Sequence, residues 1–501
     1  MWKIAAGLLI AAGLSAPAAH AEKTMRIGLT GLSPNLFDPY SNTGLPNTYS
    51  WSAVFDGLTV IDDNGAVRPW LAESWENIDP LTWRFKLRPG VVFSDGTPMT
   101  AEAVVAVGEF LTDPANQVEV VARMMSFLGA VKAIDPLTVE IRTKVPTPML
   151  PRYLPQFYIS QPDQLRRIGI KEFARKPVAT GPFVLDDITA NKATFHAHTS
   201  SWRKPKVDRV ELLVVPDAAA RRLAVEAGNM EIALQLGPEE AAAIAGGGGR
   251  QFTWLDNALW AYHFNQTGGS PYRFAPFNDI RVREALNIAV DRDAIVKTLL
   301  DGKTTAATQP APPSTYGYNP DLPKIPYDPA RARKLLAEAG YPDGFRFVLE
   351  ATVGSNANDA AILQTVAQHL AKIGVTVEIR PISTPQLIRN VMEGTWHEAM
   401  FGLMYSHEPT ADALRGLSTS SCTWAHPFYC NPKASADMAV AETTFDAAKG
   451  LELRHQVMAA YRADWAAIFM YQMVRFAGAR AGVSGLKVIN NYIYFDELEM
   501  R

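Results

Sequence analysis

The sequence contains little of what enzymes and metal centres are usually built from. Only two cysteines occur among its 501 residues. No Gly-x-Ser-x-Gly element, the turn that carries the nucleophile of many hydrolases, is present. His397 and Glu398 begin a run that ends in Phe401, where a zinc protease needs histidine, and the separation of His407 and His426 matches no metal-ligand spacing. The sequence therefore indicates neither a hydrolase nor a metalloenzyme, and no cofactor is expected.

An excess of one charge is also missing. The formal net charge is -3, which is near neutral for a chain of this length. Neither nucleic acid nor an anionic membrane is therefore expected as a partner. The hydrophobic content of 48% and the charged content of 20% are ordinary for a globular protein, and the length is enough for several domains.

The apolar run near the N-terminus, Ile4 to Leu14, is too short to span a bilayer. It follows Lys3 and precedes Ala19-His20-Ala21, which is the pattern of an export signal with its cleavage site. We expect cleavage after Ala21, so that the mature chain starts at Glu22 and, without Lys3, carries a formal charge of -4 (-3 minus 1). No cysteine lies near this site to carry a lipid anchor, and a soluble periplasmic protein is expected.

The two cysteines, Cys422 and Cys430, lie close together in the sequence. In an oxidising compartment such a pair is expected to form a disulfide across the short loop between them. Two reduced thiols in the core are the alternative.

One segment, residues 71–104, has a readable local pattern. Trp83, Phe85 and Leu87 alternate with basic residues, which predicts a strand that buries one face. Pro89-Gly90 ends this strand, and Thr100 is expected to cap a helix with apolar residues at helical spacing. The segment therefore predicts a strand, a tight turn and a helix.

Two α/β regions follow. Residues 209–236 predict a strand, a helix and a strand, which favours a partly parallel sheet. Residues 345–382 predict a second strand-helix-strand unit, after a helix that Asp328 caps and that Gly340 ends. The four glycines at 246–249 have no Gly-Lys-Ser/Thr after them, so we interpret them as the end of a helix rather than a phosphate loop. One further strand is expected over residues 487–495.

Three runs carry a resemblance to a known family. They are Ala72-Glu73-Ser74-Trp75 with the strand and the Asp95-Gly96-Thr97-Pro98-Met99-Thr100 turn after it, Thr180-Gly181-Pro182-Phe183, and the helix pair over residues 279–295. Their order resembles the family 5 solute-binding proteins, of the peptide, opine and nickel type, that serve ABC importers.

The resemblance implies an α/β fold of the periplasmic-binding-protein-like type II (cluster C) class, with two lobes, a hinge and an extra inserted domain. A discontinuous domain I over residues 22–58, 179–268 and 476–501 is expected. Domain II, residues 59–178, would be inserted into it, and domain III, residues 269–475, would form the second lobe.

Ligand-binding residues are expected where polar or aromatic side chains end a strand, because such positions face the space between lobes. The richest run is residues 404–412. In peptide-binding relatives the resemblance places an aspartate for the ligand's ammonium group where this chain has Tyr405, so capture of ordinary peptides by a free N-terminus is not implied. Glu408 or Asp412 could replace that carboxylate, although Asp412 could instead cap a following helix. The predicted ligand-binding residues are Trp260, Met404, Tyr405, Ser406, His407, Asp412 and Trp424, together with Asn35 and Leu36, which the resemblance implies to lie in a segment at the edge of the cleft.

The function expected from these observations is that of a periplasmic substrate-binding protein. It would capture a peptide-like or opine-like small solute by closure of its lobes and deliver it to a membrane-embedded ABC permease. A monomer without enzymatic activity is expected. A receptor for a metallophore, nickel or haem is one alternative, and a periplasmic hydrolase on the same scaffold is another.

Overall fold

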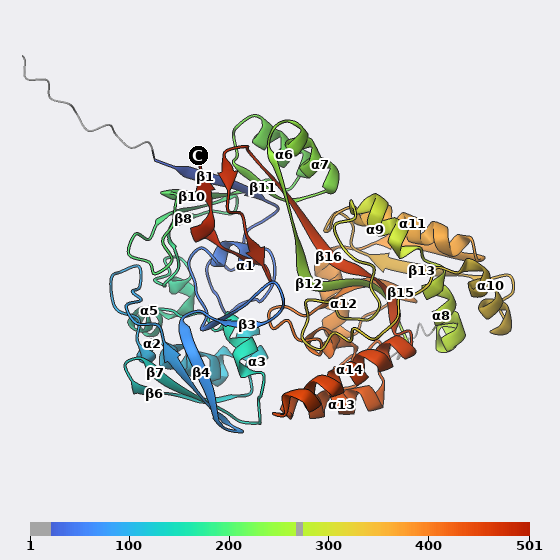
Figure 1. Cartoon of the computed structure of the whole chain (residues 1–501), viewed down its shortest axis with the longest axis horizontal. Coiled ribbons are helices and arrows are strands. Elements are labelled where there is room, and N and C mark those ends of the chain that lie inside the picture. The colour runs from blue at the N-terminus through green and yellow to red at the C-terminus, as the bar shows by residue number, and fades with distance from the viewer. Residues whose placement is uncertain (1–21, 267–273) are drawn as a thin grey trace, which may run out of the picture.

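The computed structural model describes residues 22–266 and 274–501. Its elements form two bodies, on the left and right of Figure 1, with two long strands running diagonally between them. The left body is discontinuous in sequence, because it contains both the blue N-terminal elements and the red C-terminal strands. The predicted export signal, residues 1–21, lies outside the described residues. Within the described ranges, no helix has the length and apolar character needed to cross a membrane.

A single sheet runs through both bodies. Its strands are β1 (Thr24–Leu29), β8 (Phe183–Ile188), β9 (Lys192–Ala197), β10 (Arg209–Val214), β11 (Ile232–Leu236), β12 (Arg250–Phe264), β13 (Phe345–Ala351), β14 (Val375–Pro381), β15 (Met400–Ser406) and β16 (Ala467–Ala479). The order is β14-β13-β15-β12-β16-β11-β1-β10-β9-β8. β12 and β16 are antiparallel, and their register shifts between Leu255 and Leu259. On one side of this shift, the pair of strands is hydrogen-bonded to β11 in the left body. On the other side, it is hydrogen-bonded to β15 in the right body.

The predicted strand-helix-strand unit of the left body is confirmed. β10 leads through α6 (Ala218–Glu226) to β11, and β1 lies between these two strands and parallel to both. α7 (Pro238–Gly246) follows, and the glycine run ends it before β12 begins, as expected.

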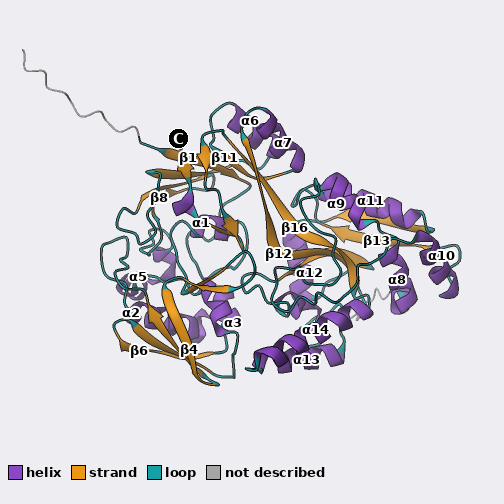
Figure 2. Cartoon of the chain, in the orientation of Figure 1, coloured by secondary structure: helices purple, strands orange, loops and turns teal. Residues whose placement is uncertain are grey.

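A separate four-stranded sheet occupies the lower left of Figure 2. It consists of β4 (Ala72–Asp79), β5 (Thr82–Leu87), β7 (Thr138–Thr143) and β6 (Leu128–Asp135), in that order. Trp83, Phe85 and Leu87 are buried, which confirms the alternation, and α2 (Ala101–Thr112) packs on β6. Thr100 precedes α2 as predicted, but its side chain makes no capping hydrogen bond. Its backbone carbonyl instead accepts from the N–H of Ala103.

Gly181, in one of the runs that resemble the family, lies against the backbone of a distant segment. Its N–H donates to the carbonyl of Val54 at 2.8 Å. A Cβ at this position would lie 2.5 Å from the carbonyl carbon of Val54, closer than any side chain can approach. Glycine is therefore needed here for packing of the chain and not for ligand contact.

The right body contains the second predicted α/β region. β13, α11 (Asp359–Ala371) and β14 lie where the sequence predicted them, and β13 and β14 are parallel. The side chain of Asp328 accepts from the N–H of Arg331 at the start of α10 (Pro329–Glu338), as predicted. The other long helices of this body are α8 (Ile280–Ile288), α9 (Arg292–Leu299), α12 (Thr384–Glu393), α13 (Pro432–Thr443) and α14 (Ala447–Ala463).

The remaining helices and strands complete the left body. They are α1 (Asn47–Trp51), α3 (Val120–Met124), α4 (Leu150–Tyr153), α5 (Pro162–Phe173), β2 (Thr59–Ile61), β3 (Val67–Pro69), β17 (Val483–Ser484), β18 (Val488–Ile489), β19 (Tyr492–Ile493) and β20 (Glu499–Met500). The single strand predicted over residues 487–495 is wrong. Asn490 and Asn491, at φ 51° and 62°, form a turn there, so β18 and β19 pair as a hairpin.

The hydrophobic core does not divide at the predicted edge of domain II. Ile27 of the large sheet and Phe85 of the four-stranded sheet belong to one buried cluster. Two further clusters lie on the two sides of the right body's part of the large sheet, and one of them extends to α6, β11 and α7 of the left body. The boundaries proposed for domains I, II and III stay predictions.

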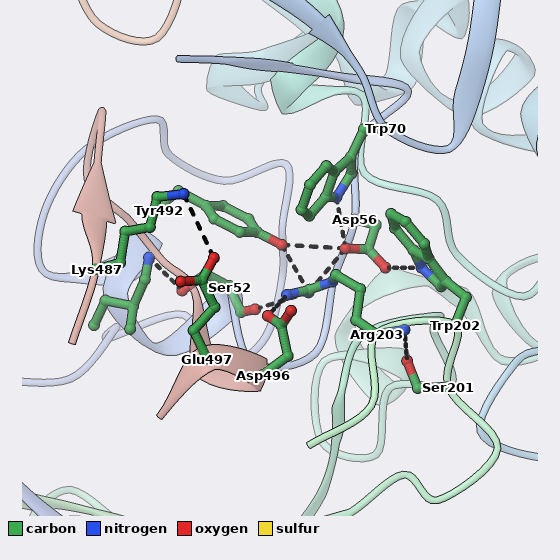
Figure 3. Close-up of polar contacts among 12 residues, drawn as sticks. Ser52, Asp56, Trp70, Ser201, Trp202, Arg203, Lys487, Tyr492, Asp496 and Glu497 are labelled. Atoms are coloured by element: carbon green, nitrogen blue, oxygen red, sulfur yellow. Dashed lines mark hydrogen bonds and ion pairs between the residues drawn. The ribbon is translucent and has the colours of Figure 1, made fainter. Parts of the chain in front are cut away.

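A buried carboxylate, Asp56, ties the parts of the left body together (Figure 3). It forms an ion pair with Arg203 at 2.8 Å, and both side chains are almost fully buried. Its oxygens also accept from the indole N–H groups of Trp70 and Trp202 and from the hydroxyl of Tyr492. These donors come from three distant segments of the chain, so the network fixes their positions.

The predicted disulfide between Cys422 and Cys430 is present. Replacing both cysteines by serine is expected to lower the free energy of unfolding by about 2–3 kcal/mol, because the bond restricts a short loop in the unfolded chain. Denaturant unfolding of the wild type, the double variant and the reduced wild type measures this. Superimposable curves with and without reductant would contradict it.

Candidate ligand-binding cleft

A cavity of about 780 Å3 lies between the two bodies. Its left wall comes from the ends of β1 and β11 and the starts of α6 and α7, and its right wall from the loop after β13 and the start of α11. Val474 and Arg475 of β16 also line it. β1, β11 and β13 belong to parallel pairs, and ligands of open α/β sheets bind at the carboxyl ends of such strands.

The cavity wall carries charges of both signs. Asp217, Glu240 and Asp359 contribute carboxylates, and Arg221 and Arg475 contribute guanidinium groups. Arg221 is buried and donates to four backbone carbonyls, among them that of Leu234 at 3.0 Å, so its donors are engaged within the left body. Burial lowers the pKa of Arg221.

A cluster of polar side chains, which we call the hinge cluster, lies where the two bodies meet. It consists of Tyr49 of α1, Asp256 of β12, Glu408 after β15, Arg475 of β16 and Asn491 of the β18–β19 turn. Arg475 donates through Nε to Asp256 at 2.6 Å and through Nη1 to Asn356 at 3.2 Å. Asn491 donates through Nδ2 to Glu408. The cluster therefore joins the left body, the right body and both crossing strands.

Further hydrogen bonds hold the segment after Glu408 to the left body. Asn490 donates to the carbonyl of Pro409 at 2.6 Å. Arg152 of α4 donates to the carbonyls of Gly65 at 2.8 Å and Thr410 at 3.0 Å. Contacts from the left body thus converge on residues 408–410 of the right body.

Burial raises the pKa of Glu408 to about 8, and the nearby carboxylate of Asp256 adds to this, while Arg475 and Asn491 oppose it. A raised carboxyl pKa stabilises the folded state at low pH, and that contribution is lost as the pH rises from the unfolded value, about 4.3, towards 8.

The Glu408→Gln variant should therefore gain stability relative to the wild type as the pH rises, because glutamine stays neutral. Thermal unfolding of both ligand-free proteins between about pH 5 and about pH 8 measures the difference in Tm. A difference that does not grow with pH would show that Glu408 titrates normally.

Tyr405 and His407, two of the predicted ligand residues, are buried within the right body. Tyr405 is 1% exposed and its ring lies 4.7 Å from that of His263. His407 is 0% exposed, and its ring nitrogens lie 3.1 Å from the carbonyl of Asp412 and 3.0 Å from that of Pro310. Burial lowers the pKa of His407. A neutral imidazole has one N–H group, so His407 donates a hydrogen bond to one of these two carbonyls inside the right body.

Asp412 is also engaged inside the right body. Its carboxylate pairs with Arg454 at 2.7 Å and accepts from the N–H of Leu414 at 2.9 Å. The second bond matches the capping alternative, although the short helix that follows begins only at Arg415. The ion pair with Arg454 could not be anticipated, because the two residues are far apart in the sequence.

The other predicted residues have different surroundings. Trp260 is 4% exposed and packs edge-to-face on Tyr262. Met404 is 38% exposed, and Ser406 is partly buried. None of the predicted ligand residues, which are Asn35, Leu36, Trp260, Met404, Tyr405, Ser406, His407, Asp412 and Trp424, lines the cavity among the described residues.

Three of these predicted residues lie at the surface of the two bodies. Asn35 is exposed, Leu36 is partly buried, and the carbonyl of Leu36 accepts from the indole N–H of Trp51 at 3.0 Å. Trp424 is partly buried and donates to the carbonyl of Val391 at 3.1 Å.

Sequence reasoning missed Asp256 and Arg475. Asp256 lies four residues before Trp260, which was the one residue of this strand predicted to contact a ligand. Arg475 is the single charged residue of a largely apolar, buried strand, which is a signal of a buried pairing. Residues 353–361 and 216–218 line the cavity, but their sequence contains no comparable signal.

Comparison with known proteins decides the family. Residues 66–424 match the family described as bacterial extracellular solute-binding proteins, family 5 Middle. The chain belongs to this family.

Curated relatives of this family 5 protein include the glutathione-binding protein GsiB of Pectobacterium atrosepticum, which is 30% identical over 467 residues and is aligned over 89% of this chain and 88% of its own length. The glutathione-binding protein GsiB of Escherichia coli O157:H7 is also 30% identical, over 462 residues, with the same coverage.

Solved structures share the fold. The substrate-binding protein CtaP from Listeria monocytogenes superposes with a TM-score of 0.84 at 19% identity, over 96% of this chain and 99% of that one. DppA from Helicobacter pylori, solved in complex with the peptide STSA, has a TM-score of 0.78 at 21% identity, over 95% and 98%. The predicted type II periplasmic-binding-protein-like fold is confirmed.

Membership of this family gives the general role of the protein. It is the substrate-binding component of an ABC importer, which captures a solute and delivers it to the permease. Its relatives are periplasmic binding proteins, and the periplasm is the compartment in which this role is carried out.

Proposed function

We propose that the protein captures a peptide-like solute in the cleft between its two bodies and passes it on chemically unaltered. The observation that carries this proposal is the cavity of about 780 Å3 with walls from both bodies. Its size lies within the range of about 300–1,000 Å3 that small-molecule sites occupy. Closure of the bodies around a guest would bury the ligand against polar groups from both sides.

The relatives direct the choice of solute. Two curated proteins that are 30% identical over most of the chain are named glutathione-binding proteins. A structural neighbour is described as DppA in complex with the peptide STSA. Glutathione and other short peptides are therefore the first compounds that we propose.

The proposed contact set starts from the cavity wall and extends to its rim. Arg475 and Asn356 line the cavity and are bonded to each other. Asn35, Leu36, Met404, Ser406 and Trp424 keep accessible surface and stay in the proposed set. Trp260, Tyr405, His407 and Asp412 are buried in this arrangement, and their contact with a ligand stays a prediction.

The remaining features of the proposal concern the state of the protein. We propose export with cleavage after Ala21 and action as a monomer without enzymatic activity or nucleic-acid binding. N-terminal sequencing of the periplasmic form tests the cleavage, and light scattering of the pure protein tests the monomer.

A thermal-shift screen tests the proposed function. The panel contains glutathione, short peptides, opines, sugar–amino acid conjugates, nickel and iron chelates, and haem. A ligand at 100 times its Kd should stabilise the folded state by about 2.7 kcal/mol. Mass spectrometry of the recovered ligand should show it unchanged. A panel in which only the chelates or haem raise Tm would favour the metallophore alternative, and turnover of a compound would favour the hydrolase.

A further inference from the structure

The two bodies also meet at contacts that lie outside the cavity. We use the name latch for a set of five residues, Gly65 and Arg152 of the left body and Tyr316, Thr410 and Ala411 of the right body. All five lie in the described part of the chain, and none of them lines the cavity. The latch is therefore able to hold the bodies together whether or not a solute occupies the cavity.

Arg152 is the centre of the latch. Its side chain is 8% exposed, and its Nη1 donates to the carbonyls of Gly65 at 2.8 Å and Thr410 at 3.0 Å. The carbonyl of Ala411 lies 3.4 Å from the same nitrogen. One nitrogen atom is thus hydrogen-bonded to both bodies, and it keeps these bonds only while the bodies stay at this separation.

An aromatic ring of the right body covers the charge of Arg152. The guanidinium carbon lies 4.7 Å from the centre of the Tyr316 ring, and that of Arg454 lies 5.0 Å from the centre of the same ring. The N–H of Tyr316 donates to the carbonyl of Ala411 at 2.8 Å, which fixes the ring beside the carbonyls that Arg152 meets. A cation–π contact is stronger when the cation is removed from water, as Arg152 is here.

The backbone of the latch permits an unusually close approach of the two bodies. Gly65 has a φ of 72°, and a Cβ at this position would lie 2.0 Å from the carbonyl oxygen of Ser314 in the right body. Any other residue would push the turn between β2 and β3 away from that oxygen. Ala411 has a φ of 48°, which is uncommon for alanine and persists only where the surrounding structure requires it. The latch is therefore a closely fitted joint.

A second contact outside the cavity joins β5 to the segment between α13 and α14. The rings of Trp83 and Phe445 stack with their centroids 6.3 Å apart and their planes at 27°. Neither residue lines the cavity, and both lie in the described part of the chain. Phe445 is 37% exposed, so this contact is formed at the surface. The bodies are thus held together at two places that the cavity does not include.

We propose that the latch keeps the two bodies closed in the ligand-free protein, so that most molecules are already in the binding arrangement before a solute arrives. The inference rests on the proposed function only in taking the cavity as the solute site. Arg152 is then a positioning residue, because it touches no solute and sets the fraction of closed molecules. A solute enters when the latch opens, and the apparent affinity is proportional to the closed fraction.

Distances measured by pulsed EPR in the ligand-free protein test the proposal. Spin labels are placed at Ala227→Cys after α6 and Lys372→Cys after α11, two exposed positions in different bodies. The two native cysteines form a disulfide and stay unlabelled. The protein with an intact latch should show mainly the distance that corresponds to the arrangement in Figure 1. In Arg152→Ala the ratio of closed to open molecules should fall by about 10- to 100-fold, the range for lost hydrogen bonds to a charged group.

A second variant and a control accompany Arg152→Ala. Phe445→Ala removes a partly exposed ring, so the variant should fold, and it should shift the distances in the same direction by a smaller amount. The control is Arg175→Ala, because Arg175 is exposed and pairs with Glu172 of the same body at 3.8 Å. Its distances should match those of the protein with an intact latch. Circular dichroism verifies that each variant is folded.

Solute binding gives a second readout, with glutathione as the probe. Arg152→Ala should weaken glutathione binding by up to the same factor as the loss of closed molecules, mainly through faster dissociation. Arg175→Ala should leave the affinity within about 2-fold. Stopped-flow kinetics and calorimetry measure the dissociation rate and the Kd.

The outcomes separate the two proposals. A ligand-free protein that lacks the closed distance, or an Arg152→Ala protein with the same distances as the parent, would overturn the latch. Both results are obtained without any solute, so they do not depend on the proposed function. Failure of glutathione and of every other peptide-like probe to bind would overturn the proposed function and leave the EPR result unchanged.

Discussion

Asp56→Ala should lower the free energy of unfolding by about 3–5 kcal/mol, because it removes one partner of a buried ion pair and leaves a charge behind. Asp56 is 0% exposed and pairs with Arg203 at 2.8 Å. The variant would also leave the indole donors of Trp70 and Trp202 and the hydroxyl donor of Thr180 without their acceptor. Asp496, at 2.6 Å from Arg203, would remain as its single carboxylate partner.

Denaturant unfolding of Asp56→Ala against the wild type measures the loss. The control is Arg68→Gln, which breaks the solvent-accessible pair between Arg68 and Asp62 in the same body. That variant should cost at most about 1 kcal/mol. An equal loss in both variants would show that the buried Asp56 network contributes no more to the free energy of unfolding than an exposed ion pair.

Asp412→Ala is expected to have the next largest effect, a loss of about 3 kcal/mol. Arg454, which is 0% exposed, would lose its carboxylate partner and keep its hydrogen bonds to the carbonyls of Ala441 and Gly450. Asp412→Asn should cost less, because the amide oxygen can still accept from the N–H of Leu414. The exposed pair between Lys433 and Asp437 provides a control, and Asp437→Ala should cost at most about 1 kcal/mol.

Ligand affinity separates the two roles considered for Asp412. If its carboxylate acts only inside the right body, the folded Asp412→Asn protein should bind the ligand found by the screen within about 2-fold of the wild type. Unfolding curves and calorimetry on the same preparation measure both quantities. A large loss of affinity with unchanged stability would instead support the ligand contact predicted from the sequence.

Local patterns in the sequence were sufficient to predict several elements of the fold. The alternation of Trp83, Phe85 and Leu87, the Asp328 cap of α10 and the glycines after α7 depend on neighbouring residues only, and the structure confirms them. The hairpin of β18 and β19 was missed, because an apolar run with two asparagines can continue as a strand or turn. The left-handed backbone of Asn490 and Asn491 resolves the choice.

The candidate site was harder to predict, because its parts are brought together only by tertiary structure. Asp256 and Arg475 are 219 residues apart in the chain and become neighbours through the pairing of β12 and β16. The sequence shows that residues 404–412 include several polar side chains, but it does not show in which direction each side chain points. His407 and Asp412 point into the right body, whereas Glu408 meets the left.

The way the chain passes between the bodies has a practical consequence for engineering. All helices and strands of the right body, from α8 to α14, lie in one uninterrupted stretch between the end of β12 at Phe264 and the start of β16 at Ala467. That stretch supplies one entire cavity wall as well as Glu408. Replacing this one continuous segment by that of a homologue, joined at the two strand ends, would therefore exchange one half of the binding site. A hybrid receptor with altered selectivity needs only this single replacement.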